Sequence, residues 1–120
     1  YLFEIASDIY GGEIAFNQEL LRDHALAMQA GDRKGYAFQL LAAWGWTSFL
    51  WLPMIKLRTL IMMGDDDPLV PPVNGRILAK RMPNATLETV ECGHMFVLTQ
   101  AEKIADRIEA FLHDDDLVVA

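Results

Sequence analysis

The stretch "LIMMGDDDPLVPP", residues 60–72, decides the fold. Four apolar residues run into Gly64, and a short apolar run bounded by glycine is typical of a strand buried on both faces. Three aspartates and three prolines follow, and such residues favour a turn in which the strand ends. Because like charges repel one another, three consecutive carboxylates at the end of a buried strand need a chemical explanation.

The residues around this stretch predict a succession of strand, helix, strand and helix. The first strand covers residues 57–63, a helix covers 73–82, and the second strand covers 86–90. A last helix is predicted from a capping box formed by Thr99 and Glu102, with a core stripe made by Ile104, Ile108, Phe111 and Leu112. This order indicates an α/β fold with a parallel sheet.

The preceding part of the chain reads as helical. Asn17 can cap a helix that ends at Gly31 and carries apolar residues at helical spacing, namely Leu20, Leu21, Ala25 and Met28. A second helix is predicted after Asp32, with one face made by Tyr36, Leu40, Leu41 and Trp44. We therefore expect two regions, 1–53 and 54–120.

The composition restricts the class of partner. A hydrophobic content of 52% and a mean hydropathy of +0.16 exclude a disordered polar chain. A net charge of -7 and a pI near 4.7 argue against nucleic acid and anionic membranes, so a small neutral or apolar ligand fits better. The single cysteine, Cys92, excludes an intrachain disulfide, and no targeting signal is visible. Both features suit the cytoplasm.

Residues 35–55 contain no charged side chain, and their number approaches what a bilayer crossing needs. Glycine, proline and polar residues interrupt this segment, and its three tryptophans do not form two interfacial belts. We therefore favour an apolar, aromatic-rich helical piece over a membrane span.

The predicted topology brings two loops together. In a parallel sheet with right-handed crossovers, the loops that follow successive strands emerge at the same edge, where open α/β sheets bind ligands. The loop "GDDDPLVPP" follows the first strand and "ECGHMF" follows the second, so an aspartate and His94 should share this edge. A carboxylate beside an imidazole fixes its tautomer and stabilises the imidazolium, as a general base requires.

Two longer stretches carry a family resemblance. "LRTLIMMGDDDPLVPP" followed by "LETVECGHMFVLTQAEKIADRIEAFL" resembles the C-terminal half of an α/β-hydrolase, where the acid follows a strand in a G-x-x-D pattern and G-H precedes the last helix. The resemblance implies Asp67 as the acid and His94 as the base of a catalytic triad. "DIYGG" at 8–12 and "GWTS" at 45–48 are similar to the intracellular poly(3-hydroxyalkanoate) depolymerases of that family.

The resemblance implies a partial α/β-hydrolase fold, with a helical cap or lid over residues 1–53. The C-terminal part of the core, comprising the last parallel strands and helices of the doubly wound sheet, would occupy 54–120. The implied activity is ester hydrolysis through a serine acyl-enzyme, without metal or cofactor, on a hydrophobic ester or a stored polyester. The implied location is the cytoplasm, including the surface of polyester granules. Another carboxylesterase of the family is the alternative.

The family's nucleophile has no counterpart in these residues. Its serine lies in a G-x-S-x-G elbow, whereas the only serines here are Ser7 in "IASDI" and Ser48 in "WTSFL". We expect a chain that carries the acid and base without the nucleophile half and shows no meaningful esterase turnover alone. A catalytically silent fragment or interaction module is the non-enzyme alternative. Open apolar strand edges also predict self-association or pairing with the missing N-terminal half.

The remaining candidates each have two interpretations. A set of aromatic residues either lines a cap that binds the alkyl groups of a polyester or simply packs within it. The set comprises Phe38 and the four predicted substrate-binding residues Trp44, Trp46, Phe49 and Trp51. Asp65 and Asp66 read as a solvated turn, because a hard-cation site would need EF-hand spacing that is missing, and no metal is predicted. We expect His24 and His113 to be structural or solvated, and Cys92 to be buried rather than nucleophilic.

Overall fold

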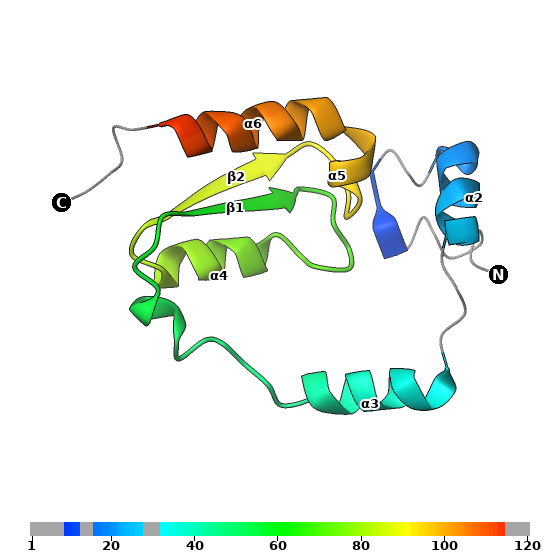
Figure 1. Ribbon diagram of the computed structural model, residues 1–120, viewed down its shortest axis with the longest axis horizontal. Helices are drawn as coiled ribbons and strands as arrows, with labels where there is room; N and C mark the ends of the chain where they lie inside the picture. Colours follow the sequence, from blue (N-terminus) through cyan, green and yellow to red (C-terminus); the bar gives the residue numbers. More distant parts are fainter. Residues whose placement is uncertain (1–8, 13–15, 28–31, 115–120) are drawn as a thin grey trace.

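The computed structural model describes residues 9–12, 16–27 and 32–114 of the chain (Figure 1). Its elements in chain order are α2 (Gln18–Ala27), α3 (Arg33–Ala43), the 3-10 helix η2 (Leu52–Met54), β1 (Thr59–Gly64), α4 (Val73–Arg81), β2 (Ala85–Val90), α5 (Phe96–Thr99) and α6 (Ala101–His113). Parts of three predictions lie outside the described residues: the context of Ser7, the first residue of "DIYGG", and the helix end at Met28 and Gly31. The predicted division at residue 53 stays a prediction.

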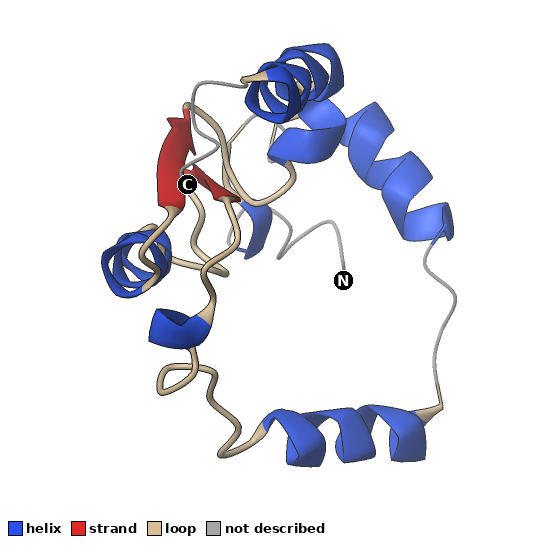
Figure 2. Ribbon diagram, turned by 60° about the vertical axis from the view of Figure 1, so that its left-hand side comes forward, coloured by secondary structure: helices blue, strands red, loops and turns tan. Residues whose placement is uncertain are grey.

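The two strands form the predicted parallel pair. β1 and β2 pair in a register that runs from Thr59 opposite Ala85 to Gly64 opposite Val90, and α4 makes the crossover between them. α4 and α6 lie on opposite faces of the sheet (Figures 1 and 2). Both strands therefore end at the same edge, from which the two loops emerge.

Alternate residues of β1 enter two different cores, as the period of a strand requires. Ile61 and Met63 are buried on the α4 side together with Leu52 and Met82. Met62 points to the other side, where it packs against a cluster of Val90, Cys92 and Ile104. The prediction of a strand covered on both faces is confirmed, although the strand begins at Thr59 because Leu57 is exposed.

The N-terminal helices form as predicted but bury little. The side-chain oxygen of Asn17 accepts a hydrogen bond from the Leu20 N–H at 3.0 Å, which confirms the predicted cap of α2. α3 buries none of its residues, so the apolar face predicted for it is exposed to solvent. Figures 1 and 2 show α3 apart from the sheet and its covering helices. Among the described helices, none has the length and apolar character that a bilayer crossing requires.

The predicted capping box of the last helix is wrong. A short helix, α5, ends at Thr99, and α6 begins after Gln100, whose side chain makes no capping hydrogen bond. The Thr99 hydroxyl instead donates to the Met95 carbonyl at 3.4 Å and lies 3.2 Å from the sulfur of Cys92. Because α5 adds a helical turn before α6, Thr99 is the last residue of α5 and does not cap the N-terminus of α6.

The predicted core stripe of the last helix is only partly right. Ile104 is buried, whereas Ile108 and Leu112 are exposed and Phe111 is half-buried beneath the Arg58 guanidinium. Ile104 is the residue of the stripe that enters the cluster formed with Val90 and Cys92.

Candidate active site

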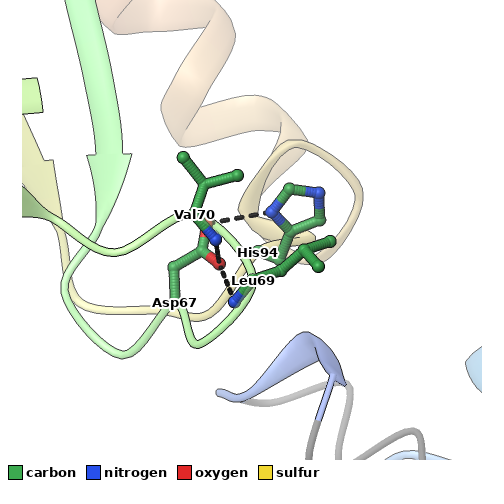
Figure 3. A network of polar contacts seen from close by, with 4 residues as sticks. All are labelled: Asp67, Leu69, Val70 and His94. Carbon is green, nitrogen blue, oxygen red and sulfur yellow. Dashed lines mark hydrogen bonds and ion pairs between the residues drawn. The ribbon is translucent and has the colours of Figure 1, made fainter. Parts of the chain in front are cut away.

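The loops after β1 and β2 bring a carboxylate and an imidazole into contact. Nδ1 of His94 lies 2.9 Å from Oδ2 of Asp67, and the opposite ring nitrogen points away from the carboxylate (Figure 3). The Asp67 side chain is 4% exposed, whereas that of His94 is 32% exposed. A buried acid thus holds one edge of a ring whose other parts remain accessible.

The acid is held by its own loop. Oδ1 of Asp67 accepts hydrogen bonds from the N–H groups of Leu69 at 2.9 Å and Val70 at 2.8 Å (Figure 3). This is the local bonding that aspartate makes in turns, and the neighbouring Pro68 and Pro71 restrict the backbone around it. A buried carboxylate needs such donors to offset its lost hydration. The turn therefore satisfies one oxygen and leaves the other for the imidazole.

Asp65 bonds to the loop after β2, so the prediction of a merely solvated turn is incomplete. Its Oδ1 accepts the N–H of Cys92 at 3.0 Å, and its own N–H donates to the Val90 carbonyl at 2.9 Å. The residue is exposed, yet its carboxylate replaces a ladder partner just beyond the paired strands. The two loops are therefore joined before either reaches the site.

Asp66 connects the same turn to two other segments. Its N–H donates to the Cys92 carbonyl at 3.1 Å, and its Oδ2 accepts the N–H of Gly12 at 3.1 Å. The three consecutive aspartates therefore have separate partners: Asp65 and Asp66 each accept a backbone N–H from another segment, and Asp67 accepts two within its own loop and contacts the imidazole. Each carboxylate has a separate positive dipole or ring N–H to face, which offsets their mutual repulsion.

Residues 9–12 form a third part of the site, which the sequence analysis did not assign. The Tyr10 carbonyl accepts the backbone N–H of His94 at 2.6 Å, and the two rings stack with centroids 6.5 Å apart and planes at 22°. Gly11 and Gly12 both have φ of 58°, and a Cβ on Gly12 would clash with the backbone of Gly93. Only glycine tolerates this conformation and this approach together. The two consecutive glycines of "YGG" were the sequence signal from which this turn could have been predicted.

The four aromatic residues predicted to bind substrate are not brought to this pair. Trp44, Trp46 and Trp51 are exposed, and Phe49 is partly covered by the Arg81 guanidinium, 4.1 Å from its ring centroid. Their segment leads from α3 to η2, whereas Asp67 and His94 lie beyond the C-terminal ends of the strands (Figure 1). Their binding role stays a prediction.

The other candidates behave as ordinary structural residues. Cys92 is buried, as predicted, and His113 is exposed and lies 3.9 Å from Glu109 on the same helix. Within residues 9–12, 16–27 and 32–114, no three His, Cys, Asp or Glu side chains gather as metal ligands would. The pair of Asp67 and His94 can accept a proton at the ring nitrogen that does not face Asp67, while the acid stabilises the resulting imidazolium.

A family model and a curated protein both match this chain. A family model described as alpha/beta hydrolase fold matches residues 10–101. The poly(3-hydroxyalkanoate) depolymerase of Ectopseudomonas oleovorans is 44% identical over 115 residues, which cover 96% of this chain and 41% of that protein. The chain thus spans less than half the length of this curated relative.

Two solved structures are similar as well. The enol-lactonase from Burkholderia xenovorans matches with a TM-score of 0.80 at 20% identity, covering 92% of this chain and 43% of its own, which is a likeness of fold alone. An alpha/beta hydrolase enzyme from a Medee basin deep-sea metagenome library matches with a TM-score of 0.53 at 29% identity, covering 54% and 24%.

Proposed function

The chain belongs to the alpha/beta hydrolase family, with the fold expected from its sequence, and from this premise we propose that it supplies the acid and the base of a serine ester hydrolase. The contact between Asp67 and His94 carries the proposal. Its place at the C-terminal edge of a parallel sheet is where open α/β sheets bind ligands.

In the proposed reaction, His94 is the general base and Asp67 its orienting acid. The imidazole takes the proton of a serine hydroxyl while the oxygen attacks the ester carbonyl, and it then returns the proton to the departing alcohol. The same imidazole next deprotonates a water molecule, which attacks the acyl-enzyme, and it returns that proton to the serine oxygen as the carboxylic acid is released. Asp67 keeps Nδ1 protonated and stabilises the imidazolium formed in each half. The route uses no metal or cofactor.

The serine is proposed to come from residues other than these 120, because the sequence contains no G-x-S-x-G elbow. A catalytically silent interaction module is the second candidate, and the same missing elbow favours it. The two candidates predict different results when a nucleophile elbow is supplied: a hydrolase then hydrolyses esters, whereas a silent module does not.

We propose a hydrophobic polyester as the substrate. The 44% identity to a poly(3-hydroxyalkanoate) depolymerase supports this, as does the exposed, charge-free aromatic segment that follows α3. Apolar rings suit the alkyl side chains of such a polymer. The corresponding proposed location is the cytoplasm, at the surface of polyester granules.

The test is a chimera in which residues 1–120 replace the matching stretch of the Ectopseudomonas oleovorans depolymerase. We expect it to hydrolyse 4-nitrophenyl octanoate and amorphous poly(3-hydroxyoctanoate) granules, and the 120-residue chain alone to hydrolyse neither. A folded chimera with only background rates on both substrates would favour the silent module. Hydrolysis of soluble short esters without attack on granules would favour a general carboxylesterase.

A further inference from the structure

We infer that Asp66 is a positioning residue for His94, acting through the turn at residues 10–12. The inference rests on the proposed function, since it concerns the orientation of the proposed base. Asp66 does not touch the imidazole; it is bonded to the segment against which the backbone and ring of His94 rest.

The first link joins the acid loop to the turn. Oδ2 of Asp66 accepts the Gly12 N–H at 3.1 Å, across 54 residues of sequence. Two successive glycines with positive φ lose more conformational freedom on folding than other residues would, so this turn needs an external anchor to hold one conformation. The Asp66 side chain is such an anchor, because its oxygen gives the Gly12 N–H a fixed acceptor.

The second link joins the turn to the base. The Tyr10 carbonyl, two residues from the anchored Gly12, accepts the His94 N–H at 2.6 Å, and the Tyr10 ring stacks on the imidazole. Gly93 packs so closely that a Cβ there would clash with the Tyr10 carbonyl and with Gly11. The main chain that leads into the Cα of His94 is thereby set by the turn.

Asp67 alone does not determine the orientation of the His94 ring. Asp67 bonds only Nδ1, so it fixes one point of the ring, whereas the direction of the other nitrogen depends also on the backbone that carries the ring. A displacement of about 1 Å in a reacting group can cost on the order of a hundredfold in rate. Loosening the turn is therefore expected to reduce proton transfer without removing the base.

The kinetic test compares three variants of the chimera. Asp66→Ala removes the acceptor, Asp66→Asn retains a carbonyl oxygen that can accept from Gly12, and Asp106→Ala removes an equally exposed carboxylate on α6. We expect Asp66→Ala to lower kcat by about tenfold with KM unchanged, Asp66→Asn to restore most of the loss, and Asp106→Ala to match the unsubstituted protein. A kcat unaffected by Asp66→Ala, or a loss shared equally by both Asp66 variants, would overturn the inference.

A second readout does not depend on catalysis. Amide hydrogen exchange is measured at Gly12 and His94, in the 120-residue chain and within the chimera. We expect both amides to exchange faster in Asp66→Ala than in Asp66→Asn, while amides of β2 are unchanged. Equal exchange in both variants, or no protection at these amides in either unsubstituted protein, overturns the inference. An inactive chimera with the expected exchange pattern would instead count against the proposed hydrolase function alone.

Discussion

The carboxylate of Asp65 accepts the backbone N–H of Cys92 at 3.0 Å, although the two residues lie 27 positions apart. This bond continues the pairing of β1 with β2 after the ladder has ended, because Asp65 also donates to the last residue of β2. The Asp65 side chain thus supplies the acceptor that a backbone carbonyl supplies within a paired strand. The loops that carry Asp67 and His94 are consequently fixed to one another at their base.

Removing either member of the proposed pair should abolish turnover. In the chimera, we expect Asp67→Asn and His94→Ala each to lower kcat for 4-nitrophenyl octanoate by roughly ten-thousandfold, the scale of triad losses in serine hydrolases. Asp106→Asn, which removes an exposed carboxylate on α6, should leave kcat unchanged. A chimera that keeps its rate in both site variants would show that these residues are not the acid and base.

The glycine at position 12 should be irreplaceable, unlike a glycine on α3. Gly12→Ala places a Cβ against Gly93 at a positive φ, so we expect the free energy of unfolding of the chimera to fall by about 1–3 kcal/mol. Gly35→Ala is the matched control, because no atom lies near its added Cβ and alanine favours helix by about 1 kcal/mol. Urea denaturation measures both. Equal effects of the two substitutions would contradict the close approach at the turn.

Two isoleucines of α6 should differ strongly in their contribution to stability. Ile104 is 3% exposed and Ile108 is 43% exposed, on the same face predicted from the sequence. In the chimera, we expect Ile104→Ala to lower the free energy of unfolding by about 2–4 kcal/mol, because it leaves a cavity, and Ile108→Ala to lower it by less than about 1 kcal/mol. Urea denaturation of the two variants is the measurement. A larger effect at Ile108 would mean that this residue is covered in solution.

Substitution of the exposed Trp46 distinguishes a role in substrate binding from a role in packing. Its exposure is 74%, so Trp46→Ala in the chimera should change stability by no more than about 0.5 kcal/mol. If it binds polyester, the preference among acyl chain lengths should shift, whereas Phe16→Ala, at an aromatic before α2 that is 88% exposed, should leave that preference unchanged. A fall in stability with an unchanged preference would assign Trp46 to packing.

The 120-residue chain by itself should associate. Among the described residues the sheet has two strands, and α3 buries none of its side chains. Unpaired strand edges and large exposed apolar surface both favour self-association in water. We expect sedimentation at about 10 µM to show species larger than the monomer, an effect that non-ionic detergent reduces. A monomer that unfolds cooperatively would contradict this.

The strands, the crossover helix and the meeting of the two loops could be predicted because each depends on local signals. Apolar runs, glycine and proline mark β1, α4 and β2, and the right-handed crossover of parallel strands places successive loops at one edge. That rule predicted that an aspartate of the first loop shares the edge with His94, and the family resemblance implied that this aspartate is Asp67, which the structure places 2.9 Å from the imidazole. The cap of α2 at Asn17 was equally local and equally predictable.

Only the tertiary structure decided the partners of Asp65, Asp66 and the turn at residues 10–12. Their hydrogen bonds cross 27 and 54 residues, and no periodicity in the sequence encodes which distant amide will approach a given carboxylate. The failed capping box has a local cause, because α5 extends through Thr99 and the threonine hydroxyl donates to the Met95 carbonyl four residues earlier. The sequence by itself determined the two strands, the crossover helix between them and the edge that carries the acid and the imidazole. Three-dimensional packing decided how that edge is held, because hydrogen bonds depend on distance in space and not along the chain.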